Sequence, residues 1–306
     1  MALVLGMDGG GTRTRAAIWD GERQMAFAEG ASIKRLRVGA EAADENLRTL
    51  LARVYAEAGV NRLDAATVGV ASATMPGVAE WILAVLRENG VTRCEVVGDE
   101  VIALDAAFHG GAGILQIAGT GANCIGRAPD GSRESAGGWS SRLGDEGSGY
   151  WIGLQAVRSA LRAYDRDEPC RILETVGKLW GTSSLEALVN LGDSTPGPDF
   201  AALAPSMLNL AVEGDAVARG VLQQAAEDLA ASVLLVRSKL RRKRGVLVEV
   251  PVAYTGGVIE KMKPVREAFL AGLKAVAPEM PVAEAPVVAL EGAIWRAKIL
   301  AGKQLQ

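Results

Sequence analysis

Histidine and cysteine are scarce in this chain of 306 residues, which contains one histidine and three cysteines. A single histidine cannot supply the several-histidine ligand set of a typical zinc hydrolase, and a Ser-His-Asp triad would have to use His109. The sequence "FHGGAG" places His109 at a predicted helix end, where a cation is favourable. Cys94, Cys124 and Cys170 are far apart and form no CxxC pair, so reduced thiols are expected. A histidine-rich metal site and a disulfide framework are therefore excluded.

Long apolar runs and a strong charge excess are also missing. No apolar segment is long enough to span a bilayer, and the N-terminus lacks the basic region and cleavage site of a signal peptide. The net charge of −3 and the pI near 5.5 argue against nucleic acid or an anionic membrane as the main partner. The length and the 49% hydrophobic content are typical of a globular chain with two domains. We expect a soluble cytoplasmic protein with neither nucleic-acid nor membrane partner.

The common nucleotide-binding fingerprints are absent, but two glycine-rich turns are present. No GxxxxGK[ST] occurs, and neither glycine turn is followed at once by a helix, so the P-loop and dinucleotide motifs match poorly. The first turn lies in "LVLGMDGGGTRTRAAIWDG", residues 3–21, between an apolar strand ending near Asp8 and an alternating second strand. Three consecutive glycines indicate a backbone that a ligand approaches closely.

A shift of 110 positions brings this stretch onto "ILQIAGTGANCIGRAPDG", residues 114–131. Gly11 then falls on Gly121 and Gly21 on Gly131. Both copies predict a strand, a glycine turn, a second strand and an Asp-Gly hairpin signal. We interpret them as two related subdomains whose bare amides could bind phosphate from both sides, although both could simply be tight turns.

The rest of the chain alternates between helices and strands. Helical spacing covers residues 44–59, 150–165 and 215–244, the last as one long helix or a closely joined pair. "AATVGVAS" and "RCEVVGD" are suited to buried strands. Residues 245–258 return to strand and glycine turn, and residues 291–303 close with a helix. This alternation predicts an α/β protein whose sheets are covered on both faces.

Asp99 is the first candidate for chemistry, because it ends an apolar strand directly before a predicted helix. One interpretation is an N-cap of that helix. The other is a carboxylate at the carboxyl edge of a sheet, where open α/β folds bind ligands.

The stretch "GGWSSRLGDEGSGYW", residues 137–151, has the composition of a functional loop. It leads into a helix that Asp145 or Ser148 could cap. Trp139 could stack on the apolar face of a sugar or fold back over the sheet.

Four motifs together resemble the N-acetylglucosamine kinase and BadF/BadG/BcrA/BcrD-type ATPase family of the sugar kinase, Hsp70 and actin superfamily. They are "GMDGGGTRTRAAI", "GTGANCIG", "GGWSSRLGDEGSGYWIGLQAV" and "YTGGV", and they follow in the correct order over almost the whole chain. The resemblance implies two ribonuclease-H-like, actin-like ATPase domains with a nucleotide cleft between them. Residues 1–110 with the closing helix 290–306 would form the N-terminal domain, and residues 111–289 the C-terminal domain.

The resemblance also implies site residues. Asp8 would hold magnesium through water, and Asp99 would be the catalytic base. The ATP-binding positions would be in the glycine turns: Gly10, Gly11, Thr12, Gly119, Thr120, Gly121, Gly256 and Gly257. The sugar-contacting positions would include Asp99 together with residues after the second turn: Ala122, Asn123, Gly138, Trp139, Ser140 and Asp145.

One position departs from the family pattern. Between Gly30 and Gly39 the N-acetylglucosamine kinases carry a sugar-binding asparagine, where this chain has Lys34 in "SIKRLRVG". Lys34, Arg35 and Arg37 could belong to a solvated loop or to an anion pocket. The change leaves room for an acidic sugar such as N-acetylmuramic acid.

The resemblance implies an enzyme that uses ATP and Mg²⁺ to phosphorylate an amino sugar, foremost the 6-hydroxyl of N-acetylglucosamine. Glucosamine and N-acetylmuramic acid are alternative substrates. A rival from the same family is the activator ATPase of a dehydratase, but its iron–sulfur cluster does not suit three scattered cysteines. A non-enzymatic nucleotide switch is a second rival, and a homodimer is left open.

Overall fold

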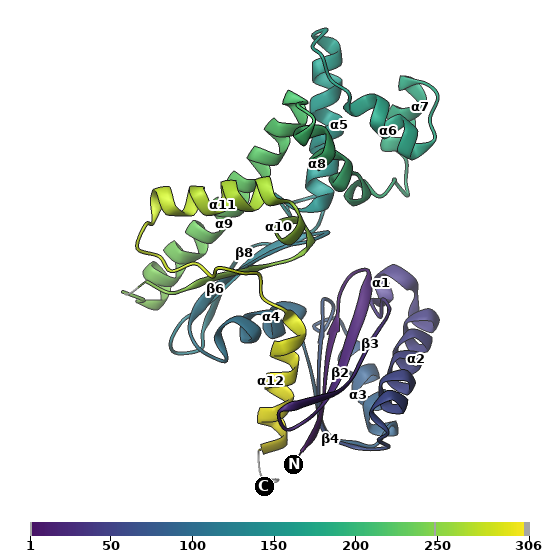
Figure 1. The fold of residues 1–306 in the computed structure, drawn as a ribbon, viewed down its shortest axis with the longest axis vertical. Helices are drawn as coiled ribbons and strands as arrows, with labels where there is room; N and C mark the ends of the chain where they lie inside the picture. Colours follow the sequence, from purple (N-terminus) through teal and green to yellow (C-terminus); the bar gives the residue numbers. More distant parts are fainter. Residues whose placement is uncertain (1, 248, 303–306) are drawn as a thin grey trace. The chain divides into compact units, whose positions relative to one another are not determined.

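The computed structural model describes residues 2–247 and 249–302, and the chain divides into two compact units (Figure 1). Unit 1 consists of Met1–Gly111 and Val287–Gln306, and unit 2 of Ala112–Pro286. Position 248 of the predicted strand segment and position 303 of the predicted closing helix lie outside the described residues. The assignment of ribonuclease-H-like domains to residues 1–110 with 290–306 and to 111–289 stays a prediction.

Unit 1 is built on a five-stranded sheet with the strand order β3-β2-β1-β4-β5. Its strands are β1 (Leu3–Gly9), β2 (Arg13–Asp20), β3 (Arg23–Ala31), β4 (Leu63–Val70) and β5 (Val91–Val97). The first three strands form antiparallel hairpins, whereas β4 pairs parallel with β1 and β5 parallel with β4. The carboxyl ends of β1, β4 and β5 therefore meet at one edge of the sheet, where ligands bind in open α/β folds.

Two helical layers cover this sheet, as Figure 1 shows. Leu5 and Met7 of β1 pack in one core with two helices, and Val4 packs on the opposite face against the C-terminal helix. A Cβ at Gly6 would lie 2.6 Å from Cδ1 of Ile294, so glycine admits that helix onto the sheet. The helices of unit 1 are α1 (Arg35–Val38), α2 (Ala40–Ala58), α3 (Val78–Glu88), α4 (Asp99–Phe108) and α12 (Ala289–Gly302).

The helix α2 ends where the sequence predicts, whereas α1 was not predicted. Gly59 ends α2 in the left-handed conformation at φ 67°, as predicted for a C-terminal glycine. Residues 35–38 form a helical turn, where the sequence left open a solvated loop or an anion pocket. His109 does follow a helix, and its ring stacks on Trp295 of α12 at 5.6 Å between ring centroids.

Unit 2 repeats the strand order of unit 1 on a smaller sheet. Its order is β8-β7-β6-β9, where β6, β7 and β8 are antiparallel neighbours and β9 pairs parallel with β6. The strands are β6 (Gly113–Ala118), β7 (Ala122–Arg127), β8 (Arg133–Gly137) and β9 (Val252–Thr255). The two sheets thus share a four-strand topology, which agrees with the duplication inferred from the glycine turns.

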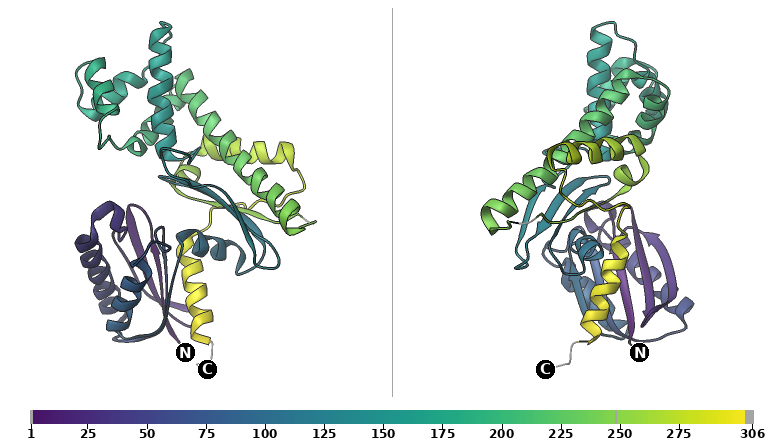
Figure 2. Two further views of the ribbon diagram at one scale, coloured as in Figure 1. Left: turned by 180° about the vertical axis from the view of Figure 1, so that it is seen from behind. Right: turned by 60° about the vertical axis from the view of Figure 1, so that its left-hand side comes forward.

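One long helix covers the sheet of unit 2, and α11 packs along it (Figure 2). Within the segment 215–244, residues 216–244 form a single helix of 29 residues rather than a joined pair. Across the described ranges, no helix is both long and apolar enough to cross a membrane. The remaining helical elements are α5 (Gly149–Asp165), α6 (Ile172–Trp180), α7 (Leu185–Gly192), η1 (Phe200–Leu203), α8 (Ala204–Val212), α9 (Ala216–Arg244), α10 (Gly257–Lys261) and α11 (Lys263–Val276).

Candidate active site

The glycine turn of unit 1 presents bare backbone to open space. The β1–β2 pairing ends at Gly9 and Thr14, so Gly10, Gly11 and Thr12 lie in the turn. A Cβ placed on Gly11 would meet nothing within 4 Å, and one on Gly10 would meet only a backbone carbonyl oxygen. Among the described residues, none lies against the Cβ position of Gly11, which leaves the close approach that a ligand requires.

The segment that contains Lys34 lies against this turn. The Ser32 hydroxyl donates to the Gly10 carbonyl at 3.2 Å and accepts from the Lys34 amide at 3.2 Å. The Asn46 side-chain amide holds the Ser32 carbonyl at 2.9 Å. Ser32 and Asn46 were not predicted, because only the folded backbone reveals the contact with Gly10.

Asp99 is the first residue of α4, directly after β5. Gly98 takes the N-cap position, so the N-cap interpretation of Asp99 is wrong by one residue. The pKa of Asp99 is raised to about 7, chiefly by burial and also by the neighbouring charges of Glu100 and Asp8. A carboxyl group with a pKa near neutrality is suited to general-base chemistry at physiological pH.

Glu100 is a site neighbour that the sequence pattern did not indicate. A Cβ at Gly98 would overlap the Glu100 carboxylate, so this side chain folds back over the residue that precedes Asp99. The Asp99 carboxylate in turn accepts from the Glu100 amide at 3.0 Å. The small residue in "GDE" is the only sequence signal that could have revealed this arrangement.

The second glycine turn, in unit 2, is enclosed by other segments of the chain. The Gly149 amide donates to the Gly119 carbonyl at 2.8 Å, and the Tyr150 amide to the Thr120 carbonyl at 3.2 Å. A Cβ on Gly119 would lie 4.0 Å from the Gly257 amide nitrogen. The predicted phosphate turn and the predicted adenosine turn therefore lie side by side within this unit.

Gly256 has a backbone that few other residues could adopt. Its φ is 109°, and a Cβ there would overlap the Ala118 carbonyl. The carboxylate of Glu260, which the sequence did not single out, accepts from the Gly256 amide at 2.7 Å and from the Thr255 hydroxyl at 3.0 Å. Glu260 thereby fixes the turn at the start of α10.

The predicted sugar loop folds onto β7 and the second turn. A Cβ on Gly121 would lie 2.8 Å from Oδ2 of Asp145, and one on Gly138 would lie 3.0 Å from Cγ of Asn123. Asp145 is 8% exposed with φ 58°, a left-handed backbone that brings its carboxylate beside the turn. Ser148, not Asp145, caps α5, because its hydroxyl accepts from the Trp151 amide.

Trp139 and Ser140 begin this loop beside Ala122 and Asn123. The Trp139 side chain is 78% exposed, which excludes the alternative that it folds back over the sheet. Ser140 has a φ of 146°, so the backbone turns sharply after the tryptophan. A flat, exposed ring is available for stacking on an apolar sugar face.

The predicted residues therefore fall into two sets, and each set is assembled within one unit. Unit 1 gathers Asp8, the turn 10–12, Lys34 and Asp99 along one sheet edge and the loop beside it. Unit 2 gathers three segments that begin or end beside its glycine turn: 119–123, 138–145 and 256–257. The structure gives their geometry, and their roles stay predictions.

The residues present fit a magnesium ion only with help from a substrate. Asp8 supplies a carboxylate, the type of oxygen ligand that Mg²⁺ prefers, and its charge acts on the neighbouring Asp99. Within residues 2–247 and 249–302, no three histidine, cysteine or acidic side chains gather into a protein-only metal site. Magnesium usually takes one or two carboxylates with water and substrate phosphates, which matches this arrangement.

The fold and the paired glycine turns define a two-domain α/β protein of the actin-like ATPase class. The crystal structure of a protein provisionally assigned as an N-acetylglucosamine kinase, from Chromobacterium violaceum, matches with a TM-score of 0.73 at 26% identity, covering 98% of this chain and 99% of that chain. A profile of the BadF/BadG/BcrA/BcrD ATPase family matches residues 5–295, so the chain belongs to that family. The predicted fold class and the predicted family are confirmed.

Two relatives extend the similarity over most of the sequence. The N-acetylmuramic acid/N-acetylglucosamine kinase of Clostridium acetobutylicum is 29% identical over 280 residues, which is 88% of this chain and 89% of that protein. The N-acetyl-D-glucosamine kinase of Dictyostelium discoideum is 28% identical over 278 residues, which is 85% of this chain and 86% of that protein.

Proposed function

We propose that the protein is an ATP-dependent amino-sugar kinase that transfers the γ-phosphoryl group to the 6-hydroxyl of N-acetylglucosamine. The observation that carries the proposal is Asp99, a carboxyl group with a pKa of about 7 on the strand edge that also carries Asp8. The two kinases similar to this chain act on N-acetylated amino sugars by name, which supports the same substrate class.

Asp99 acts as the general base in this proposal. Its carboxylate accepts the proton of the sugar hydroxyl while the hydroxyl oxygen attacks the γ-phosphorus, and ADP leaves with the bridging oxygen. Phosphoryl transfer depends mainly on positioning and charge neutralisation, so a well-placed base and bare amides suffice. Magnesium, held through water by Asp8, would supply positive charge to the phosphates.

Each glycine turn binds a different part of ATP. Residues 10–12 bind the terminal phosphates through exposed amides, and residues 119–121 form the second phosphate loop. Gly256 and Gly257 flank the adenosine, at a turn that Glu260 fixes. The amides of such turns form anion-binding concavities without any lysine of the P-loop type.

The sugar is bound by the loop that begins at Gly138. Asp145 and Asn123 supply hydrogen-bonding groups beside the second turn, together with Ser140 and the backbone of Ala122, and Trp139 offers its exposed ring. N-acetylglucosamine is the first candidate, and glucosamine is an alternative.

Lys34 favours a second substrate, N-acetylmuramic acid, which carries a carboxylate. Ser32 links the Lys34 backbone to the glycine turn of unit 1, so the residue lies beside the turn that follows Asp8. The Clostridium relative is named for both sugars, which supports this alternative. A cytoplasmic location and a homodimer stay predictions.

The Asp99→Asn variant tests the base. We expect sugar-dependent ADP release to fall at least about a hundredfold, the usual scale for a positioned base, while ATP binding is retained. A coupled ADP-release assay and ATP titration calorimetry measure the two quantities. An Asp99→Asn enzyme with full turnover refutes the role, and ATP binding without turnover on any sugar points instead to a nucleotide switch.

The Lys34→Asn variant tests the choice of sugar. The assay compares N-acetylglucosamine, glucosamine, glucose, N-acetylmannosamine and N-acetylmuramic acid. We expect the variant to lose any preference for the acidic sugar, because the ammonium group that pairs with its carboxylate is gone. Arg37→Asn, on the exposed side of α1, is the matched control. An unchanged ranking of sugars removes Lys34 from substrate recognition.

A further inference from the structure

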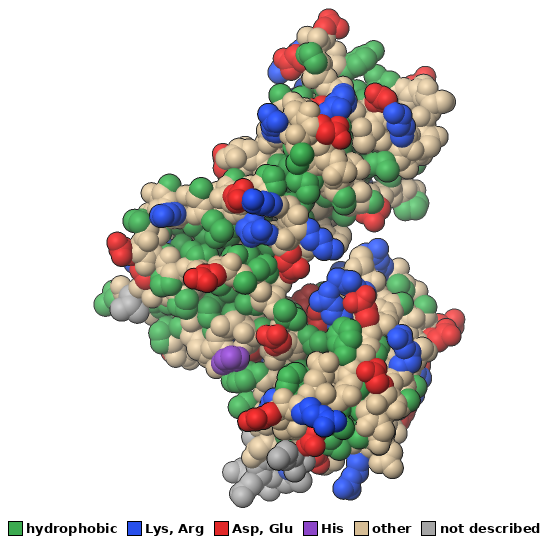
Figure 3. All heavy atoms as spheres, viewed as in Figure 1, with side chains coloured by type: hydrophobic (Ala, Val, Ile, Leu, Met, Phe, Trp, Pro, Cys, Tyr) green, Lys and Arg blue, Asp and Glu red, His purple; other side chains and the backbone are tan. Residues whose placement is uncertain are grey.

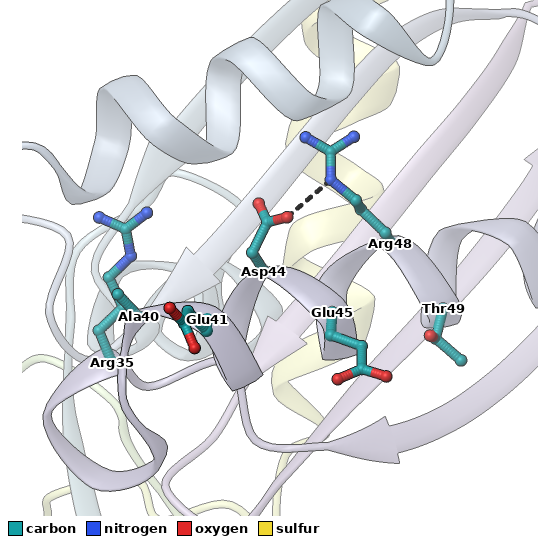
Figure 4. A pocket seen from close by; sticks show the side chains of 7 residues that line it. All are labelled: Arg35, Ala40, Glu41, Asp44, Glu45, Arg48 and Thr49. Carbon is teal, nitrogen blue, oxygen red and sulfur yellow. Dashed lines mark hydrogen bonds and ion pairs between the residues drawn. The ribbon is translucent and has the colours of Figure 1, made fainter.

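A hollow of about 590 Å³ lies on unit 1 over α1 and the first half of α2, outside the residues proposed for catalysis (Figure 4). Two arginines line it, Arg35 from α1 and Arg48 from α2. In Figure 4 the guanidinium groups of both arginines and the Asp44 carboxylate point to the same side of α2, whereas Glu45 and Thr49 point away. The hollow is therefore lined by both charges, with Arg35 and Arg48 beside three carboxylates, Glu41, Asp44 and Glu45.

The two arginines differ in their hydrogen bonds. Arg48 is paired, because its Nε donates to Asp44 at 2.8 Å and its Nη1 to Glu88 at 2.9 Å. Arg35 donates to no partner among the described residues, and its Nε is buried. An unpaired buried donor is unfavourable, so Arg35 has unused hydrogen-bonding capacity.

A rigid platform holds Arg35 in place despite its lack of hydrogen bonds. Its guanidinium carbon lies 3.9 Å from the centroid of the Trp81 ring. The Trp81 indole N–H donates to Asp44 at 2.6 Å, so the ring is itself fixed. Stacking on an aromatic face leaves the edge of a guanidinium group available for a planar, bidentate partner.

Charge around the hollow limits what could bind. The pKa of Asp44 is lowered by hydrogen bonds from Trp81 and Arg48 and by the charges of Arg48 and Arg35. This carboxylate therefore stays ionised and offsets part of the Arg35 charge without a hydrogen bond to it. Glu41 also lines the hollow and opposes a multiply charged anion. Lys and Arg side chains nevertheless gather over the α1 end of unit 1 (Figure 3). The balance favours a small ligand with a single anionic group.

We propose that Arg35, stacked on Trp81, binds one carboxylate or phosphate-monoester group of a small molecule. Arginine forms its strongest charge-assisted contacts with these planar or multi-oxygen anions. Two sources have this chemistry. One is the acidic substituent of the sugar substrate, and this assignment rests on the proposed kinase function. The other is a separate phosphorylated metabolite.

The binding test uses Arg35→Met and Arg35→Lys in the full chain, with Arg37→Met as the matched control on the same helical turn. N-acetylglucosamine 6-phosphate and inorganic phosphate are titrated while NMR follows the Trp81 indole N–H signal, assigned by its loss in Trp81→Phe. We expect the wild type and Arg37→Met to respond. Arg35→Met should bind roughly ten- to a hundredfold more weakly, the range for losing hydrogen bonds to a charged group, and Arg35→Lys an intermediate amount.

The kinetic arm separates the two sources. An increase in KM for N-acetylmuramic acid, but not for N-acetylglucosamine, in Arg35→Met assigns the site to the substrate. A phosphate response in the presence of saturating sugar assigns it to a separate ligand, and this binding result holds even if the protein phosphorylates no sugar. The proposal is overturned if Arg35→Met, still folded by its thermal midpoint, changes neither the NMR response nor any KM.

Discussion

The glycine turns of the two units occupy the same place in the same strand order, yet their surroundings differ. Gly11 of unit 1 faces open space, whereas Gly121 of unit 2 lies under the Asp145 carboxylate. The sheet edge of unit 1 also carries the interacting Asp8 and Asp99. The repeated strand topology thus produces two similar backbone turns. The surrounding segments make them different, because the turn of unit 1 lies near two acidic side chains and the turn of unit 2 is covered by loops.

The helices that support the two units also differ in how they are held. In unit 1, Arg296 of α12 contacts Glu95 through two nitrogens at 2.9 Å and Asp105 at 2.6 Å, and the Asp105 side chain is 1% exposed. In unit 2, the Arg171–Glu213 pair is about half exposed at both partners. Only the first network ties the helix that begins with Asp99 to the C-terminal helix.

The largest expected effect on stability comes from breaking the ion pairs that Arg296 makes with Glu95 and Asp105 in unit 1. Arg296→Met leaves the buried Asp105 carboxylate without this cation, so the free energy of unfolding should fall by about 3–5 kcal/mol. Glu213→Gln, which disrupts an exposed pair, should cost less than about 1 kcal/mol. Urea unfolding of both variants measures the difference, and equal losses would contradict the contrast between the units.

The pH dependence tests whether the acids of unit 1 interact as described. Below a pKa of about 7, Asp99 is protonated, so kcat/KM should fall about tenfold per pH unit as the base is lost. Glu100→Gln removes the neighbouring charge and should move this limb to lower pH. The exposed Glu88→Gln is the control, and an acid limb that stays in place in Glu100→Gln would separate Glu100 from Asp99.

The free energy of unfolding also depends on the protonation of Asp99, but it falls as the pH rises, whereas kcat/KM rises. The folded pKa of Asp99 is raised above its ordinary value of 3.8, so the folded state keeps a proton that the unfolded chain releases between about pH 4 and pH 7. Stability contributed by this group is present at low pH and is lost as the pH rises through that window. Asp99→Asn should therefore flatten the decline, which thermal unfolding across pH measures.

Equivalent substitutions in the two turns should have smaller and unequal effects. The Cβ of Gly121→Ala would lie 2.8 Å from Asp145, so we expect a loss of about 1–3 kcal/mol and a higher KM for the sugar. Gly11→Ala meets nothing in the chain and should leave the unfolding temperature nearly unchanged while weakening ATP binding. Thermal unfolding with ATP titration compares them, and matching losses of stability would show that the turns are not differently enclosed.

The features predicted from the sequence are those that short patterns encode. Strand alternation, the glycine turns and the end of α2 at Gly59 depend on local periodicity and backbone freedom, and all are present. The shared strand order also follows from the repeat at a shift of 110 positions. The family resemblance supplied the site residues, whose roles await the tests above.

The features that were missed depend on contacts between distant segments. Glu100 lies over Gly98, Glu260 fixes the Gly256 turn, and Ser32 bonds to Gly10. The helical turn at Arg35 has Trp81 as its platform, and that residue comes from another helix. No periodic pattern records such pairs, because each is created only when separate elements pack together.

The packing of α12 has a consequence for how the protein is made. Ile294 occupies the space that Gly6 leaves on β1, so one face of the first sheet is completed by a segment that lies about 280 residues further along the chain. All of unit 2 is synthesised in between. A nascent chain must therefore carry an uncovered apolar surface until unit 2 has been synthesised, and a fragment that stops before residue 287 would keep that surface exposed.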